Sequence, residues 1–308
     1  MTEFAEIDRQ LPLGEEIFLD HIGHFVPDPE IASRALARAG FAPTPVSVQT
    51  QPDPAGGAPR LTGTGNVTAM LGRGYIEVLF RTSDTPLGQE LDAAMARHAG
   101  IHLVAFAVAD AGNAHARLRR EGFRLRPLVD MQRPVETMGA PGIAAFTVAR
   151  PEPGEMPEGR IQLLTHRTEP MVWQPRWLAH PNCATGLNSV TIAVGDLEEA
   201  ARRFGRLTGR QPRSSARGQT IGLDRGRVEL VTATAFAKML PEVPLPSLPF
   251  IGAYGISVAS LETVERILRQ GGLPYVQRGQ SLIAPFPPEL GCGAWLFSGP
   301  NAASAGPR

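Results

Sequence analysis

A strand–turn–helix pattern occurs four times along this chain, and it limits the possible folds more than any other feature. The first copy begins with Leu19-Asp20-His21-Ile22-Gly23-His24-Phe25-Val26-Pro27-Asp28. Asp28 and Phe41 are 13 residues apart, as are Asp110 and Phe123. Equivalent turns occur at three later points, Val108-Ala109-Asp110, Val194-Gly195-Asp196 and Val258-Ala259-Ser260. Such repetition predicts one structural unit used four times, whose copies pack together to bury their apolar faces.

Each copy is predicted to be a βαβββ unit. Pro29 can open the first helix and Gly40 can end it, and the remaining strands follow from apolar alternation and turn residues. The predicted strands of the first two units are 18–26, 41–49, 66–71, 75–80, 102–108, 123–129, 143–150 and 160–165, with helices at 30–39 and 111–120. The third unit spans 187–234 with a helix at 197–207. The fourth has strands at 254–258, 281–284 and 294–297 and a helix at 261–270.

The predicted fold class is α+β, with four βαβββ modules paired into two curled mixed-sheet half-barrels. Such a unit exposes sheet edges and one apolar face, so two units must pair side by side around a central cup. We expect a flexible arm over residues 1–16, a first module pair over 17–180, a second pair over 181–300 and a disordered tail over 301–308.

Composition narrows the class of partner. The chain has 30 basic and 30 acidic side chains, so no basic surface for nucleic acid or an acidic membrane is expected. No stretch approaches the roughly 20 apolar residues of a membrane span. Two cysteines, Cys183 and Cys292, fit a reducing cytoplasm better than a disulfide scaffold. We therefore expect a cytoplasmic protein with a small-molecule substrate, and a homodimer is left open.

The four units, with Leu-Asp-His and Phe-Val-Pro-Asp in the first strand and Gly-Tyr-Ile-Glu-Val-Leu at 74–79, resemble the vicinal oxygen chelate superfamily and its glyoxalase-like group. The resemblance covers nearly the whole chain. It implies the fold more specifically than the reaction, because the superfamily includes glyoxalase I, extradiol dioxygenases, epimerases and antibiotic-resistance proteins. Many members bind a divalent metal through the first and last strands of each paired unit.

Carried over by position, the resemblance implies metal ligands at His21, Glu77 and Gln162. The fourth position corresponds to Leu103, and His102 is one residue away, so His102 joins the ligands only if a bulge turns it inward. His166 lies four residues after Gln162 on the same strand face and is the alternative, as ligand or general base. Glu77 and His166 are therefore the candidate catalytic residues. The implied ion is Fe(II), Mn(II), Ni(II), Co(II) or Zn(II).

Other polar residues have more ordinary interpretations. His24 is expected to point away from His21, and Arg133 can form an ion pair with Glu136 near the cup. The second module pair has Ser189, Glu229, Ala253 and Leu296 at the corresponding ligand positions, so we expect no metal there, because one carboxylate holds a transition metal poorly.

The sequence therefore supports three hypotheses. The first is a metal-dependent lyase, isomerase or dioxygenase acting on a small oxygenated molecule. The second is a binding protein of the same fold that sequesters a ligand without turnover. The third is a scaffold that dimerises through the second module pair.

Overall fold

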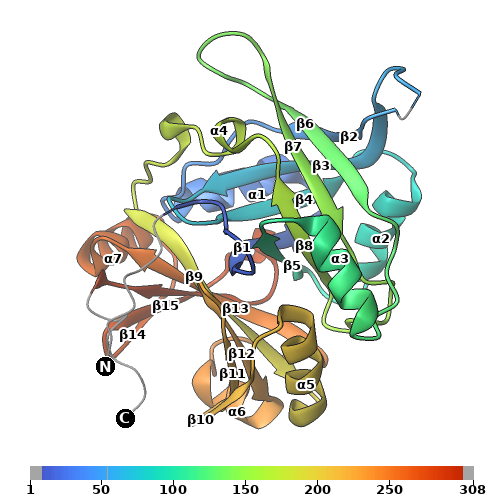
Figure 1. Ribbon diagram of the computed structural model, residues 1–308. Coiled ribbons are helices and arrows are strands. Elements are labelled where there is room, and N and C mark those ends of the chain that lie inside the picture. Colours follow the sequence, from blue (N-terminus) through green and yellow to red (C-terminus); the bar gives the residue numbers. More distant parts are fainter. Residues whose placement is uncertain (1–8, 54, 301–308) are drawn as a thin grey trace.

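The computed structural model describes residues 9–53 and 55–300, and it confirms two halves that each contain two βαβββ units (Figure 1). The first half runs through β1 (Ile17–Phe25), α1 (Pro29–Arg38), β2 (Ser47–Gln51), β3 (Arg60–Met70), β4 (Tyr75–Arg81), α2 (Pro86–Met95), β5 (Gly100–Val108), α3 (Ala111–Arg120), β6 (Val129–Val135), β7 (Gly142–Ala149) and β8 (Arg160–His166). The connection contains α4 (Glu169–Val172) and the 3-10 helix η1 (Pro175–Trp177).

The second half repeats the plan with shorter outer strands. It contains β9 (Ala184–Val194), α5 (Leu197–Thr208), β10 (Arg213–Ser215), β11 (Gly218–Gly222), β12 (Arg227–Thr232), α6 (Ala233–Met239), β13 (Phe250–Val258), α7 (Leu261–Gln270), β14 (Val276–Arg278), β15 (Ser281–Pro285), the 3-10 helix η2 (Pro288–Leu290) and β16 (Ala294–Ser298). None of the helices in the described part of the chain is long and apolar enough to span a membrane.

The two sheets differ in closure. The first half forms a closed barrel in the order β1-β4-β3-β2-β6-β7-β8-β5, whereas the second is an open sheet in the order β10-β11-β12-β9-β13-β16-β15-β14. The pairing of β2 with β6 that closes the barrel is short, with Thr50 opposite Gln132. Closure goes beyond the predicted half-barrel and surrounds the cup of the first half with strands on all sides.

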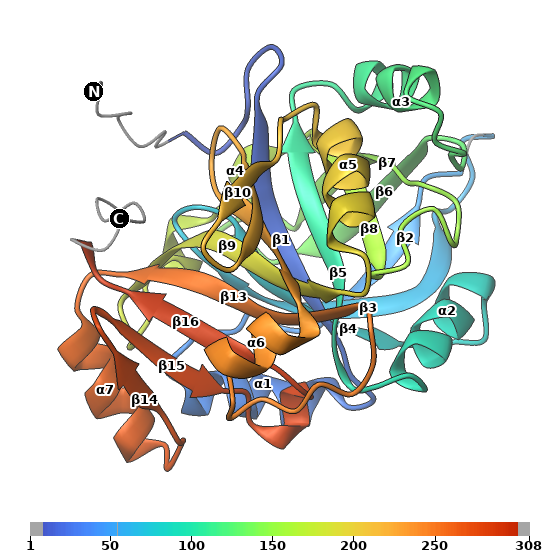
Figure 2. The same ribbon diagram turned by 90° about the horizontal axis from the view of Figure 1, so that it is seen from below.

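The two halves share one hydrophobic core. Figures 1 and 2 show β1 next to β9 and β13, where the halves meet. The ring of Phe41 lies 5.6 Å from that of Trp295 and 6.3 Å from that of Phe297. His24 points away from the barrel interior, and its Nε2 lies 3.0 Å from the Tyr254 hydroxyl of the second half. The outer face of the barrel is therefore buried by the second half.

The strand and helix assignments differ from the sequence predictions in identifiable places. Strand β2 begins at Ser47 instead of residue 41, because Pro43 and Pro45 have no N–H to donate to a strand ladder. Helix α2 was missed, although Thr85 caps it and Pro86 occupies its first turn. The missed helix α6 is capped by the Thr232 side chain in the same way.

Residues 1–8 of the expected arm lie outside the described residues, and so does the whole of the expected tail, 301–308. The described part of the arm contacts both halves. Arg225 Nη1 of the second half donates to the Arg9 carbonyl at 2.6 Å, and the Gln10 side chain donates to the Gly72 carbonyl of the first half.

Candidate functional site

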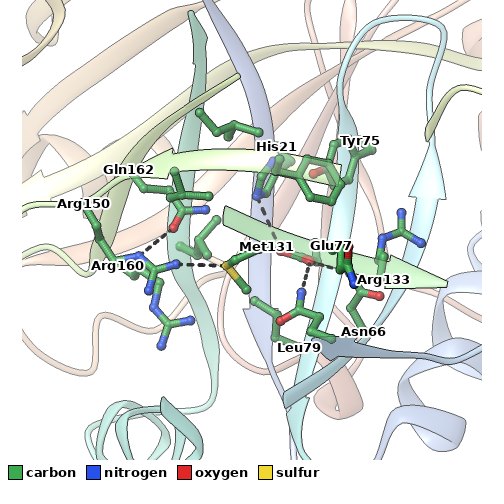
Figure 3. Close-up of a pocket in the computed structure, with 16 residues that line it drawn as sticks. His21, Asn66, Tyr75, Glu77, Leu79, Met131, Arg133, Arg150, Arg160 and Gln162 are labelled. Atoms are coloured by element: carbon green, nitrogen blue, oxygen red, sulfur yellow. Dashed lines mark hydrogen bonds and ion pairs between the residues drawn. The ribbon is translucent and has the colours of Figure 1, made fainter. Parts of the chain in front are cut away.

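The interior of the closed barrel contains a cavity of about 50 Å³ (Figure 3). Its walls come from inward-facing residues of all eight strands and from Arg150, just beyond β7. The lining residues are His21, Gln49, Asn66, Tyr75, Glu77, Leu79, Leu103, Met131, Gln132, Arg133, Phe146, Val148, Arg150, Arg160, Gln162 and Leu164. Three of the four predicted ligand positions, His21, Glu77 and Gln162, therefore face one cavity.

Glu77 of β4 is the one carboxylate among the residues that line this cavity. It is 5% exposed, and its Oε1 accepts hydrogen bonds from Asn66 Nδ2 at 2.6 Å and from Gln49 Nε2 at 3.4 Å. Its Oε2 lies 3.5 Å from His21 Nε2. Two amides thus fix one oxygen of Glu77 and leave the other toward the imidazole, an orientation suited to proton transfer.

Asp20 contacts His21 at Nδ1, the ring nitrogen that is not next to Glu77. The pairing of β1 with β5 shifts register between Leu19 and His21, so Asp20 is the extra residue of a β-bulge. Its fully buried carboxylate has Oδ2 2.7 Å from His21 Nδ1 and Oδ1 2.9 Å from His166 Nε2. The bulge therefore lets neighbouring residues, Asp20 and His21, contact one another where regular alternation would separate them.

The charge of Asp20 decides the tautomer of both histidines. Burial opposes its ionisation, but attraction by His166 and hydrogen bonds from His166 and His21 lower the pKa of Asp20 below its usual range. The carboxylate accepts, so His21 Nδ1 and His166 Nε2 donate. His21 Nε2 is then the nitrogen that faces the cavity and Glu77.

The Tyr75 ring packs against His21, with centroids 4.4 Å apart and planes inclined by 20°. Burial, together with the charges of Asp20 and Glu77, raises the pKa of Tyr75 well above its ordinary value. Tyr75 therefore remains a neutral phenol and fixes the imidazole plane.

The opposite end of the cavity is basic. Arg150 Nε donates to Gln162 Oε1 at 3.1 Å, and Arg160 Nη2 lies 3.3 Å from Glu90 Oε2. Burial and the neighbouring Arg160 lower the pKa of Arg150 to about 9, so its guanidinium stays charged at neutral pH. Figure 3 shows Arg150, Arg160 and Gln162 at one end and Glu77, Asn66 and Arg133 at the other.

The remaining predicted residues, His102 and His166, do not line the cavity. His102 lies in a second bulge between β1 and β5, but its Nε2 is 2.7 Å from the His98 carbonyl and its ring lies 4.3 Å from the His98 ring. The bulge therefore does not turn His102 to the His21–Glu77 pair. His166 is buried, with Nε2 2.9 Å from Asp20 Oδ1, and its ring packs edge-on against Tyr75 and Phe146 of the cavity wall.

The side chains around the cavity offer too few donors for the divalent metal that the resemblance implies. Within the described residues, no group of three His, Cys, Asp or Glu side chains is placed to hold a metal ion. His21 and Glu77 are the two strong donors, Leu103 occupies the fourth position, and the Gln162 oxygen already accepts from Arg150. Two donors beside a guanidinium do not fit a protein-held transition metal.

The corresponding cup of the second half is lined by Ser189, Glu229 and Leu296, three of the four equivalent positions. The Glu229 carboxylate accepts from Arg227 Nε at 2.7 Å. This cup therefore has a carboxylate at the position of Glu77 but no imidazole at the position of His21.

Comparison with known proteins identifies the family. A sequence model described as a glyoxalase-like domain matches residues 19–208, which is more than half of the chain and nearly the whole barrel. The chain belongs to the glyoxalase-like domain family. Membership of the vicinal oxygen chelate superfamily, indicated by the repeat and its motifs, is thereby confirmed. No curated protein matches this glyoxalase-like chain.

Solved structures support the fold of this glyoxalase-like protein. A hypothetical protein from Staphylococcus aureus has a TM-score of 0.60 and 11% identity, covering 92% of this chain and 99% of that one. A 4-hydroxymandelate synthase mutant from Streptomyces coelicolor has a TM-score of 0.59 and 14% identity, with 92% of both chains covered. The Mn(II)-bound glyoxalase from Novosphingobium aromaticivorans has a TM-score of 0.53 and 11% identity, covering 92% and 82%. At these identities the similarity establishes the fold and not the reaction.

Sequence reasoning missed the residues that surround the predicted pair. Asp20 was hidden by the assumption of a regular strand, although Asp-His neighbours are a recognisable donor–acceptor pair. Arg160 lies two residues before Gln162 and therefore on the same face of its strand, and Arg150 is the last residue of the predicted strand 143–150. The positive charge that they share was the signal available in the sequence. Asn66 lies on the same face of β3 as Thr68, the residue opposite Glu77, so alternation along the strand could have placed it diagonally beside Glu77.

Proposed function

We propose that this protein is an isomerase or lyase that moves a proton at a carbon beside a carbonyl or carboxylate group of a small oxygenated acid. The observation that carries the proposal is the pairing of Glu77 Oε2 with His21 Nε2 at 3.5 Å in the barrel cavity. A carboxylate and an imidazole held at this distance lie on the same side of a reacting carbon and can pass a proton between them.

The proposed step uses side chains of this chain alone. Glu77 Oε2 accepts the proton of the C–H bond, and the electron pair of that bond moves into the neighbouring carbonyl. The cationic end of the cavity, at Arg150 and Arg160, stabilises the negative charge that develops on oxygen. The proton then returns to carbon from Glu77, or from His21 Nε2 after Glu77 has passed it there, and Asp20 balances the charge of the imidazolium so formed.

A metal is not part of the proposal, because the donor set around His21 and Glu77 does not fit one. The Mn(II) bound by the Novosphingobium glyoxalase belongs to that protein. For the same reason the dioxygenase alternative, which requires a redox metal, is not included.

Proton exchange with solvent tests the proposal directly. Small 2-oxo acids, 2-hydroxy acids and diacids are incubated with the protein in D₂O, and loss of their C–H signals is followed by proton NMR. Glu77→Gln removes the base, and Glu229→Gln removes the equivalent carboxylate of the second half as a matched control. We expect exchange with wild type and Glu229→Gln and a rate lower by about 100-fold or more with Glu77→Gln. Exchange that does not depend on Glu77, or no exchange with any acid, would contradict the proposal.

A second candidate is a binding protein that holds a small acid without turnover. Leu103 favours it, because an apolar residue occupies the position where the family resemblance implies a further ligand. Saturable binding of an acid together with no Glu77-dependent exchange would support this alternative.

A further inference from the structure

Arg133 of β6 is a buried cation that feels the charge of Glu77 but forms no ion pair with it or with any other described residue. It is 6% exposed, and among the described residues it has neither a hydrogen bond nor an ion pair. The ion pair with Glu136 expected from the sequence is not formed, and the Glu136 carbonyl instead accepts from Arg176 Nη2 at 2.5 Å. Burial lowers the pKa of Arg133, which is the cost of holding a charge out of water.

The guanidinium of Arg133 borders the barrel cavity (Figure 3). A buried charge without an ion pair is unfavourable, so an anion that enters the cavity gains from pairing with it. Arg133 therefore points to a ligand, in contrast to Arg203, whose charge is fully paired with Glu158 and Glu199.

Arg150 provides a second anchor at the far end of the cavity. Its Nε is used by Gln162 and its Nη2 lies 3.8 Å from Met131 Sδ, but no carboxylate within 4 Å pairs with it in the described chain. Gln162 accepts through Oε1, so its amide N–H groups are free to donate. The cavity lining thus presents the guanidinium groups of Arg133 and Arg150, together with that of Arg160, which is paired with Glu90, beside the single carboxylate of Glu77.

From this arrangement we infer that the cavity recognises a small dicarboxylate, with one carboxylate on Arg150 and Gln162 and the other on Arg133. The carbon chain between them then faces Glu77 and His21. The inference rests on the proposed function for the chemistry at that carbon and adds the substrate class.

Size and shape favour a short diacid. A cavity of about 50 Å³, with space for only a few water-sized groups, favours the shortest diacids over longer ones. A planar carboxylate matches the fork of a guanidinium with two parallel hydrogen bonds. Two anchors at opposite ends select two separated negative groups over the concentrated charge of a phosphate.

Calorimetric titration tests this inference without turnover. Malonate, succinate and glutarate are compared with butyrate, monomethyl succinate and inorganic phosphate, using wild type, Arg133→Met, Arg133→Lys and Arg150→Met. Arg227→Met, which removes an equal charge from the cup of the second half, is the control. Circular dichroism and thermal melting verify that each variant is folded, and Arg133→Lys keeps the test valid if Arg133→Met is unstable.

We expect wild type and Arg227→Met to bind one of the diacids about 10- to 100-fold more tightly than its monoacid or monoester, the range expected for one charged hydrogen-bonding pair. Arg133→Met should remove this preference and leave monoacid affinity within about twofold, and Arg133→Lys should retain part of it. Equal affinity of wild type for diacid and monoacid, tighter binding of phosphate, or an unchanged preference in Arg133→Met would overturn the inference.

The same titrations on Glu77→Gln separate this inference from the proposed function. Diacid preference without Glu77-dependent proton exchange would leave the ligand class intact and refute the enzyme. Glu77-dependent proton exchange on monoacids without diacid preference would leave the proposed enzyme intact and refute the ligand class.

Discussion

Asp20 Oδ2 lies 2.7 Å from Nδ1 of His21, the next residue in the chain, because a β-bulge brings both side chains together. The same carboxylate holds His166 through its other oxygen, 2.9 Å from His166 Nε2. His166, a candidate catalytic residue by its strand position, thus acts in this account as a positioning residue. The neighbouring Asp20 therefore fixes both the position of the His21 ring and the nitrogen that carries its proton.

Replacing Asp20 should alter catalysis without removing the reacting groups. Asp20→Asn keeps the size of the side chain, but its amide cannot balance an imidazolium. We expect kcat for proton exchange to fall about 10- to 100-fold with KM nearly unchanged, and the pH profile to shift. Steady-state NMR exchange rates between pH 5 and 9 measure both. A lower kcat with an unaltered pH profile would indicate a purely structural role for Asp20.

Acid should destabilise the contact between the halves through His24. Burial lowers the pKa of His24 to about 4, below its ordinary value of 6.5. Between these values the unfolded chain binds a proton that the native His24 does not, so the free energy of unfolding falls as pH falls from about 6.5 to 4. The shift corresponds to about 3 kcal/mol over that window.

Urea unfolding of wild type and His24→Gln at several pH values checks this expectation. The variant should lose part of the decline between pH 6.5 and 4, whereas His115→Gln on α3 should retain it. His102, whose pKa burial lowers to about 3, contributes a separate decline that both variants keep. Identical pH dependence of wild type and His24→Gln would refute the assignment.

The ion pair of Arg203 with Glu158 also joins the halves. Arg203 Nη1 lies 2.6 Å from Glu158 Oε2, and the two side chains are 8% and 1% exposed. Arg203→Met leaves a buried carboxylate without its partner, and we expect a loss of about 3 kcal/mol in the free energy of unfolding. Adding Glu158→Met should recover part of the loss. If the double variant is less stable than Arg203→Met, the pair is not the source of the effect.

The repeat predicted the fold because strand alternation and turn spacing are local properties that four copies reinforce. It could not predict closure of the barrel, which depends on β2 meeting β6 across 82 residues at Thr50 and Gln132. His21, Glu77 and Gln162 face one cavity because position within a unit determines the face of a strand. Asp20 and His102 deviate because each lies at a bulge, where alternation fails.

The arginines of the cavity were harder to foresee for a different reason. Arg133 follows Gln132 and lies three residues from both Asp130 and Glu136, so this polar segment suits an exposed strand equally well. Only the three-dimensional closure of β6 beside β2 buries it. The metal was therefore inferred from sequence positions shared with the family, whereas the basic cavity is visible only once the strands have closed into a barrel.

Metal content, together with proton exchange after chelation, tests the central claim that Glu77 and His21 act without a resident metal. The protein is purified without chelator or a metal-affinity tag, analysed for transition elements, and assayed in D₂O before and after dialysis against a chelator. We expect well below one ion per chain and undiminished exchange. One ion per chain, lost in His21→Ala and Glu77→Ala while circular dichroism shows an intact fold, with exchange that stops on chelation, would contradict the claim.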